Sequence, residues 1–267
     1  MLREASNNKI YNINCKKMKI GIIGIGAIGG TIAQKLANAG HEVHVTNTDE
    51  PQKLAEKAKQ LGAIPSTIEL VIDMEVVIVS VPTTAIPELA KSLFNDLSKN
   101  VIIVDTSNYY PFRDGEIADL KNGKVESVWV AEQLGHPVIK AFNNLLAYTL
   151  AHAGKGEGQK DRIAMAVAGD DAEAKKVIAG LVNDAGFDAI DSGSLSESWR
   201  HQPGTPAYCT ELDAEELKQA LAEGKKEDAP ILRDKAIAEL SALPSYPSHP
   251  DVVNFNRGLF EKNPKTK

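Results

Sequence analysis

Long basic runs and long apolar runs are both missing from this sequence. Its formal net charge is −6, and it carries no dense cluster of lysine and arginine. We therefore expect neither nucleic acid nor an anionic membrane as its main partner, because both attract clustered positive charge. It has no stretch of about 18 apolar residues, the length that a membrane-spanning helix needs. Small, polar or phosphorylated ligands stay open for a globular protein of this composition.

Cysteine is also scarce. The two cysteines, Cys15 and Cys209, lie far apart in the sequence, and neither belongs to a cluster with metal-ligand spacing. We expect no structural disulfide and no metal site, since free thiols are typical of a reducing cytoplasm. Residues 1–17 are polar and lack the apolar core of a secretory signal. We expect them to form an N-terminal extension of a cytoplasmic protein.

What the sequence does contain is a strand that runs into a glycine-rich turn. The apolar residues in 20–25 indicate a buried strand, and Gly24, Gly26 and Gly29 follow the spacing G-x-G-x-x-G. In this motif the first glycine permits a tight turn, and the second lets a pyrophosphate approach the backbone. The third lets the next helix pack closely on the strand. The phosphates would bind the free amides at the positive end of that helix.

The following residues supply the context that the motif requires. Apolar residues recur at helical spacing up to Ala39, Gly40 marks the helix end, and residues 41–46 alternate as a second strand. Such a strand–helix–strand unit is typical of a dinucleotide-binding Rossmann fold. We predict an α/β protein with a doubly wound, mostly parallel sheet over residues 18–193. A short, mainly helical C-terminal segment follows over residues 194–267.

The later pattern continues this alternation. Further strands are predicted near residues 63–64, 74–81, 101–106, 137–142, 162–169 and 187–191. Helices are predicted near residues 51–61, 86–93, 125–134, 144–152, 172–185, 214–223 and 230–240. Ser66 and Glu69 fit a capping box for one more short helix.

The end of the second strand decides which dinucleotide binds. An acidic side chain there would accept hydrogen bonds from the ribose of NAD, whereas Asn or Thr can donate to the 2′-phosphate of NADP. Asn47 stands at this position, and Lys53, a little further along, is within reach of a phosphate. Asp49 would either repel a phosphate or cap the next helix. The balance favours NADP over NAD.

Two more strand ends lie at the same edge of the predicted sheet. Ser80-Val81-Pro82 ends the fourth strand, where Pro82 would stiffen the backbone beneath a bound ring. The alternative interpretation, that Pro82 only ends the strand, has equal weight. Ala141-Phe142-Asn143 ends the sixth strand, and Phe142 and Asn143 would stand beside the nicotinamide in a doubly wound sheet. Between them, residues 107–115 are dense in aromatic side chains, which could bind a planar ligand or cover the sheet.

These stretches together resemble the coenzyme F420-dependent NADP oxidoreductase family. The resemblance rests on residues 19–46, 79–82 and 140–144, and on Ala168-Gly169-Asp170-Asp171 with the later Asp191-Ser192-Gly193-Ser194-Leu195. It covers residues 18–195 and implies a Rossmann domain that binds NADP(H). It also implies a deazaflavin (F420) or flavin ring stacked on the nicotinamide as co-substrate, and a homodimer.

The resemblance also implies roles for single residues. It places Ile25, Ala27 and Ile28 at the pyrophosphate loop, Asn47 and Thr48 at the 2′-phosphate, and Asn143 and Leu145 at the flavin side. The sequence departs from the family at Thr48, where an arginine is typical.

No acid–base pair stands out, so no catalytic residue is assigned. Hydride transfer between two rings needs them parallel and near contact, and orientation supplies much of the rate. A dehydrogenase of a hydroxyl or carbonyl group would need a proton donor, for which the candidates are His136, Lys140, His152 and His201. We expect NADP(H)-dependent hydride transfer with a small-molecule donor or acceptor, either F420 or a flavin.

Two alternatives stay open. The first is an NAD(P)-dependent reductase of a small hydroxy acid, carbonyl or imine, like the β-hydroxyacid dehydrogenases. Those proteins carry a long helical domain with a catalytic lysine, whereas only residues 194–267 follow the sheet here. The second is a nucleotide-sensing protein that has kept the binding site without turnover.

Overall fold

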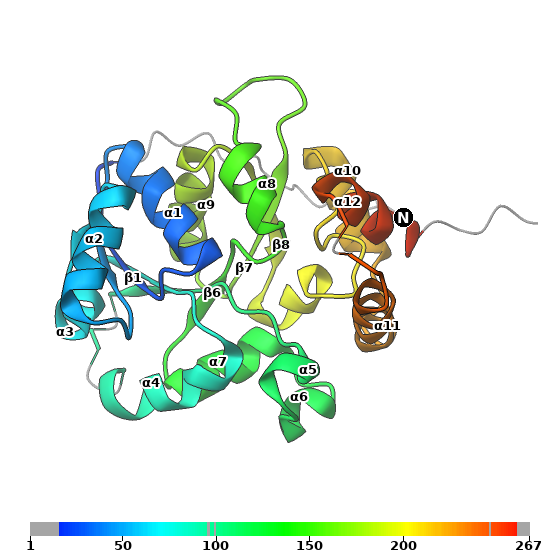
Figure 1. Cartoon of the computed structure of the whole chain (residues 1–267), viewed down its shortest axis with the longest axis horizontal. Helices are drawn as coiled ribbons and strands as arrows, with labels where there is room; N and C mark the ends of the chain where they lie inside the picture. Colours follow the sequence, from blue (N-terminus) through cyan, green and yellow to red (C-terminus); the bar gives the residue numbers. More distant parts are fainter. Residues whose placement is uncertain (1–15, 95–96, 99, 246, 261–267) are drawn as a thin grey trace, which may run out of the picture.

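The computed structural model describes residues 16–94, 97–98, 100–245 and 247–260 (Figure 1). Most of the expected N-terminal extension lies outside these residues, as does Cys15. Within them, the chain forms one eight-stranded sheet with helices on both faces. The Rossmann-type α/β architecture expected from the sequence is confirmed.

The sheet has the strand order β3-β2-β1-β4-β5-β6-β7-β8. Its strands are β1 (Lys19–Ile23), β2 (Glu42–Thr46), β3 (Ile64–Pro65), β4 (Val76–Val79), β5 (Ile102–Asp105), β6 (Val138–Lys140), β7 (Ala164–Ala168) and β8 (Asp188–Gly193). Neighbouring strands are parallel except β6 and β7, which pair antiparallel at Lys140 and Ala168. Because β1 lies between β2 and β4, the strand order reverses beside the glycine turn, which is where α/β proteins bind ligands.

Helices cover the sheet in two layers (Figure 1). One layer holds α1 (Ala27–Asn38), α2 (Pro51–Leu61), α8 (Ala147–His152) and α9 (Ala172–Asp184); the other holds α3 (Ile68–Ile72), α4 (Ile86–Leu93) and α7 (Glu126–Leu134). Side chains alternate between the layers along each strand: in β1, Ile20 and Ile22 face the α1 layer and Ile23 faces the α4 layer. The central strands β1 and β4 are therefore almost entirely apolar, as expected for a parallel sheet that is buried on both faces.

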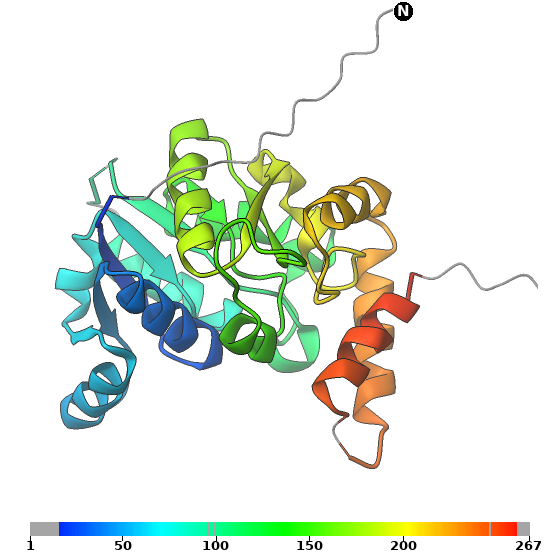
Figure 2. The same ribbon diagram turned by 90° about the horizontal axis from the view of Figure 1, so that it is seen from above.

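The C-terminal part adds helices beside the sheet. α10 (Ala214–Glu223) packs on β7 and β8 through the buried side chains of Leu217 and Leu221. α11 (Ala229–Ser241) and α12 (His249–Gly258) form a pair that projects from the body in Figure 2. The sequence pattern predicted α10 and α11 but missed α12, because prolines surround its start. Pro250 lies in the first turn of α12, where its missing amide hydrogen breaks no hydrogen bond.

Shorter elements connect these layers. They are the 3₁₀ turns Thr83–Ala85 (η1) and Leu195–His201 (η2), and the short helices α5 (Pro111–Asp114) and α6 (Ala118–Lys121). The expected capping box at Ser66 is wrong. Thr67 precedes α3, and the Ser66 hydroxyl bonds His44 Nδ1 at 2.8 Å instead.

Across the described ranges, we find no helix that combines the length and apolarity needed to cross a membrane.

Candidate active site

The glycine motif forms the turn between β1 and α1. Gly24 has a φ of +91°, and a Cβ there would overlap the carbonyl oxygen of Ser80. A Cβ on Gly29 would overlap the carbonyl oxygen of Gly24, whereas a Cβ on Gly26 would meet nothing within 4 Å. No side chain caps the N-terminus of α1, so its first amides are available to a ligand. These features fit a dinucleotide pyrophosphate.

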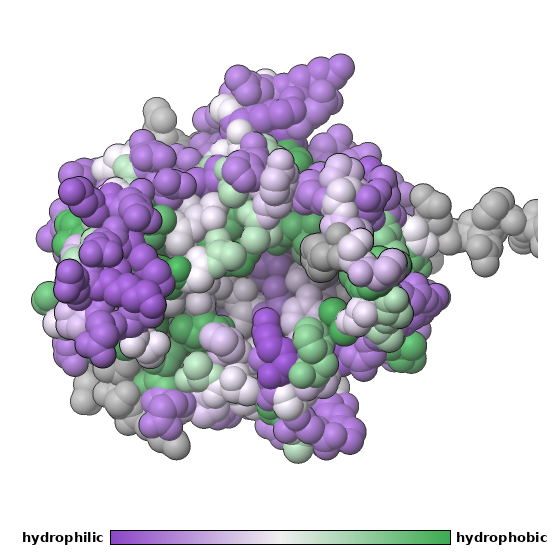
Figure 3. Space-filling model, viewed as in Figure 1, coloured by the Kyte–Doolittle hydropathy of each residue, from purple (hydrophilic) through white to green (hydrophobic). Residues whose placement is uncertain are grey.

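A pocket of about 420 Å³ opens directly from this turn. Figure 3 shows the molecule hollowed at its centre, between α1 and α8 on one side and α5 and α7 on the other. The pocket is lined by residues 26–28, by the strand ends 80–82 and 106–110 with Arg113, and by residues 142–147 and 208–209. The fold therefore gathers a nucleotide turn, several strand ends and one C-terminal loop around a single space.

Most of the predicted site residues lie at this edge of the sheet. The pocket is lined by Gly26, Ala27, Ile28, Ser80, Val81, Pro82, Asn143 and Leu145. Gly24, Ile25 and Gly29 complete the turn behind it, and Ala141 is fully buried below it. Asn47, Thr48 and Lys53 lie further along the same edge, after β2.

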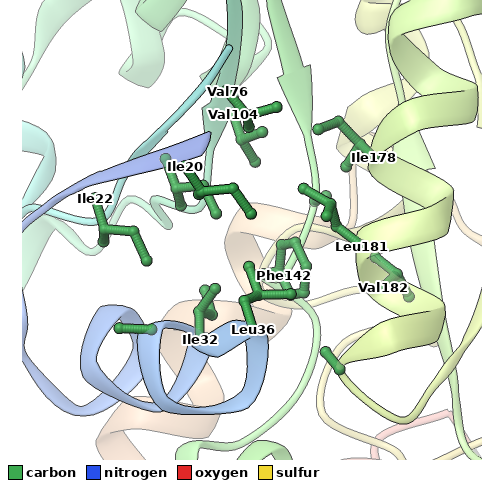
Figure 4. Close-up of a cluster of buried hydrophobic side chains, with 14 of the residues drawn as sticks. Ile20, Ile22, Ile32, Leu36, Val76, Val104, Phe142, Ile178, Leu181 and Val182 are labelled. Carbon is green, nitrogen blue, oxygen red and sulfur yellow. The ribbon is translucent and has the colours of Figure 1, made fainter. Parts of the chain in front are cut away.

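Phe142 adjoins the pocket, but its ring packs elsewhere. The residue has a φ of +60° and is 1% exposed. Figure 4 shows the Phe142 ring between Leu36 of α1 and Leu181 of α9, within the core. The left-handed backbone thus turns the side chain away from the pocket and leaves the next residue, Asn143, to face it.

The end of β2 holds a small charged network. Asp49 accepts a hydrogen bond from the Asn47 amide at 2.7 Å and from Lys57 Nζ at 2.5 Å, and Lys53 Nζ lies 3.8 Å from the same carboxylate. The hydrogen bonds from Lys57 and Asn47 lower the pKa of Asp49. Lys57 was not predicted, although its spacing of four residues from Lys53 places both lysines on one helix face.

Beneath the pocket, β5 and β6 carry a buried ion pair. Lys140 and Asp105 are 1% and 0% exposed, and Lys140 Nζ lies 3.0 Å from Asp105 Oδ2. The same ammonium donates to the carbonyl oxygen of Ser107, and the Ser127 hydroxyl donates to Asp105 at 2.8 Å. Lys140 therefore holds the turn after β5 in place, and two of its three ammonium protons are engaged.

Glu126 at the start of α7 supports the same turn. One of its carboxylate oxygens accepts a hydrogen bond from the Tyr109 amide at 3.1 Å. Burial raises the pKa of Glu126 to about 7, although the nearby Lys140 charge acts in the opposite direction. The loop that carries Tyr110 into the pocket is thus anchored from below by a buried carboxyl group.

His201 of η2 is fully buried behind Asn143. Its Nδ1 lies 2.9 Å from Asn143 Oδ1, and its Nε2 lies 3.2 Å from the Ser192 hydroxyl. The Asn143 amide donates to the His201 carbonyl oxygen and to Asn108 Oδ1. Burial lowers the pKa of His201 to about 3, so the ring is neutral at physiological pH. His201 fixes the Asn143 side chain and holds no proton for a substrate.

The other two histidine candidates lie away from the pocket. His136 precedes β6 at the amino edge of the sheet, opposite to the glycine turn. His152 ends α8 and stacks against Tyr148, with ring centroids 4.5 Å apart. In the part of the chain that the structure describes, no three His, Cys, Asp or Glu side chains gather in a way that could hold a metal ion.

Two tyrosines close the pocket on the side toward α11 and α12. The hydroxyl oxygens of Tyr110 and Tyr208 lie 2.7 Å apart, and burial raises the pKa of both side chains. The Arg113 guanidinium lies 5.3 Å from the ring centroid of Tyr110 and donates to Asp114. Burial also raises the pKa of the adjacent Cys209 thiol to about 12. The side chains of Tyr110, Tyr208 and Cys209 therefore stay protonated at neutral pH.

Comparisons with known proteins decide the family. The family described as NADP oxidoreductase, coenzyme F420-dependent, matches residues 19–109. Protein YjhV of Escherichia coli is 41% identical over 103 residues, which cover 39% of this chain and 75% of YjhV. The chain belongs to the F420-dependent NADP oxidoreductase family. This membership supports an NADP-dependent oxidoreductase.

Solved structures extend the likeness along the chain. A hypothetical protein from Sinorhizobium meliloti has a TM-score of 0.64 and 27% identity, and the match covers 74% of this chain and 95% of that one. A proposed F420-dependent NADP-reductase from Arthrobacter has a TM-score of 0.57 and 23% identity, over 86% of this chain and 96% of that one. At 23% identity, the similarity to the Arthrobacter protein shows the fold alone.

A longer relative matches this chain over only part of its own length. Metalloreductase STEAP3 of Rattus norvegicus is 27% identical over 194 residues, which are 72% of this chain but 37% of STEAP3. The family match ends at Tyr109. The C-terminal side of the pocket, with Tyr208 and Cys209, therefore lies outside the part that defines the F420-dependent family here.

Proposed function

We propose that this protein passes a hydride between NADP(H) and a flat deazaflavin or flavin ring. The observation that carries the proposal is the lining of the pocket. Among the described residues that line it, the ionisable side chains are those of Arg113, Tyr110, Tyr208 and Cys209, and burial raises the pKa of the last three, which makes them poor proton donors. Reduction of a carbonyl or imine group needs a proton donor at the substrate atom, whereas transfer between two rings needs chiefly their alignment.

The sequence-derived candidates for a proton donor do not supply one in this pocket. Lys140 is buried and bonded to Asp105, and His201 is neutral and bonded at both ring nitrogens. The pocket instead offers apolar side chains at Ile28, Pro82 and Leu145, which suit the faces of stacked rings. This arrangement supports binding and orientation as the main contributions of the chain.

Different residues around the pocket would hold different parts of the bound ligands. The amides of α1 and Gly26 would hold the pyrophosphate, and Asn143, fixed by His201 and Asn108, would face the rings. When bound, NADPH would supply a hydride from C4 of its nicotinamide, and the acceptor ring would take it up together with a proton from water.

The charged network after β2 supports NADP(H) over NAD(H). Asp49 accepts hydrogen bonds from Asn47 and Lys57 on one carboxylate oxygen, Oδ2, so part of its negative charge is already compensated beside the place of a 2′-phosphate. Lys53 and Lys57 bring two positive charges to the place where a 2′-phosphate would lie. Thr48 takes the position at which an arginine is typical of the family, and the two lysines offer an alternative source of charge.

The test is to follow the NADPH absorbance band with separate acceptors. We expect oxidation of NADPH with 5-deazaflavin or flavin, and none with hydroxy-acid precursors, aldehydes or imines. Oxidation by a carbonyl compound alone would replace the proposal with a carbonyl reductase. Tight NADPH binding without turnover on any acceptor would replace it with a nucleotide sensor. The homodimer and the cytoplasmic location expected from the sequence stay predictions.

A further inference from the structure

Tyr110 and Tyr208 line two cavities. Both side chains line the main pocket, and both also line a smaller cavity of about 140 Å³ beneath α11 and α12. The pair thus forms the wall between them. Ile28, Pro82 and Leu145 give part of the main pocket an apolar lining, and the two hydroxyl groups are polar features of its wall.

The hydrogen bond between the two hydroxyl groups leaves part of their hydrogen-bonding capacity unused. At 2.7 Å, one hydroxyl donates to the other and uses one of the two hydrogens. Tyr208 also shares a side-chain hydrogen bond with the Cys209 thiol, and sulfur is a weak partner that the carbonyl oxygen of a ligand would displace. One hydroxyl hydrogen and several lone pairs therefore stand next to each other at the pocket wall. Such a pair can donate and accept hydrogen bonds side by side.

We infer that the Tyr110 and Tyr208 hydroxyl pair binds the imide edge of the acceptor ring, and that this contact selects rings that have such an edge. An imide group places a carbonyl acceptor beside an N–H donor, which complements one free hydroxyl hydrogen beside one free lone pair. Flavins and deazaflavins both carry this group. The inference rests on the proposed function, because it names the residues that would hold its acceptor.

Both tyrosines are held rigidly enough to act as a fixed receptor. Asp114 accepts a hydrogen bond from the Tyr110 amide at 2.9 Å and also binds Arg113, which covers the Tyr110 ring. On the other side, the backbone of Cys209 is left-handed, with a φ of +56°.

The loop around Cys209 is tied down from two directions. The Cys209 amide donates to the Asn144 carbonyl oxygen at 2.9 Å, and Asn256 of α12 donates to the Cys209 carbonyl oxygen at 3.1 Å. These bonds hold a strained backbone conformation that places the neighbouring Tyr208 against Tyr110. α12 thereby takes part in shaping the pocket without lining its main chamber.

The inference is tested with two probes that differ at one atom. 5-Deazariboflavin and its imide N-methylated derivative are titrated separately against the full-length protein saturated with NADP⁺, and binding is followed by deazaflavin fluorescence. We expect the wild type to bind the parent ring about three- to tenfold more tightly than the methylated ring, the effect of one hydrogen bond. Tyr110→Phe and Tyr208→Phe should each remove most of this discrimination, with the dissociation constant of NADPH unchanged.

Tyr148→Phe is the matched control, because Tyr148 is 57% exposed and does not line the pocket. It should keep the full discrimination. Equal binding of the two probes by the wild type would overturn the inference, as would an undiminished preference in Tyr110→Phe. If Tyr208→Phe does not fold, Tyr110→Phe alone decides. Failure of the proposed function has a different signature, since the wild type would then bind the ring without oxidising NADPH.

Discussion

The two ends of the pocket are built from different materials. At the nucleotide end, the shape comes from backbone: Gly24 and Gly29 permit close approach, and α1 presents free amides. At the acceptor end, the shape comes from side chains that loops bring together, including Tyr110, Asn143 and Tyr208. A backbone site can bind a pyrophosphate in any protein with the same turn, whereas a side-chain site can change its ligand by single substitutions.

From this difference we predict that the stability of the acceptor end depends more on buried polar groups than the stability of the nucleotide end does. The largest effect should follow Lys140→Met, which leaves the buried Asp105 carboxylate without its charged partner. We expect a loss of about 3–5 kcal/mol in the free energy of unfolding, measured by denaturant titration. The double variant Lys140→Met/Asp105→Leu should recover part of that loss. A loss below about 1 kcal/mol in the single variant would mean that the pair does not support this end of the pocket.

The acceptor end should also respond to pH through Glu126. Its folded-state pKa of about 7 exceeds the ordinary value of 4.5, so the folded protein binds a proton that the unfolded chain releases. The contribution of this group to stability is fully present below pH 4.5 and is lost as the pH rises to about 7. Glu126→Gln keeps a hydrogen-bond acceptor for the Tyr109 amide but cannot ionise.

The stability of Glu126→Gln relative to the wild type should therefore increase by about 2–3 kcal/mol between pH 5 and pH 8. Denaturant titrations of both proteins at several pH values give this difference. Contributions common to both proteins, such as that of the buried His201, cancel in it. A difference that does not vary with pH would show that Glu126 ionises normally.

At the nucleotide end, two glycines in one turn should behave differently. Gly29→Ala introduces a Cβ that overlaps the Gly24 carbonyl oxygen, and we expect it to lower the free energy of unfolding by about 1–3 kcal/mol. Gly26→Ala places its Cβ in open space, so the melting temperature should not change while NADPH binding weakens by about tenfold or more. Thermal unfolding and NADPH fluorescence separate the two outcomes. Unchanged NADPH affinity in Gly26→Ala would place the pyrophosphate elsewhere.

The smallest effect should come from Lys57→Ala at the adenosine side. Without Lys57, Asp49 loses its shortest ion pair, and its negative charge would repel a 2′-phosphate. NADPH should bind roughly three- to tenfold more weakly, with little change for NADH. Lys59→Ala is a control on the same helix, since no ion pair joins Lys59 to Asp49 within the described residues. An equal loss for both nucleotides would argue against a phosphate contact.

The same difference explains what could be predicted from the sequence. The pyrophosphate turn is contiguous, so its spacing and the following strand are enough to find it. The tyrosine pair joins residues that are 98 positions apart, and no spacing in the sequence places Tyr208 near Tyr110. The ring of Phe142 was expected beside the nicotinamide, but a left-handed backbone directs it into the core. Such a backbone at a residue other than glycine has no local sequence signal.

The charged side chains also show a limit of prediction from the sequence. Lys140, inside a predicted strand, was one of the candidate proton donors, and only the pairing of β5 with β6 brings Asp105 against it. His201, in the predicted C-terminal segment, was another candidate, but the fold buries it and both of its ring nitrogens form hydrogen bonds. Residue type indicates what a group can do, and tertiary contacts decide whether it is free to do it.

The central claim is direct hydride transfer between the nicotinamide and an acceptor ring. The measurement that tests it most directly is a single turnover in ordinary water, with NADPH deuterated on each face of C4 in turn and 5-deazariboflavin as acceptor. The account predicts that the deuterium from one of the two faces appears on carbon in the reduced deazaflavin. Loss of the label to water from both forms, or persistence of NADPH in the presence of the bound ring, would contradict it.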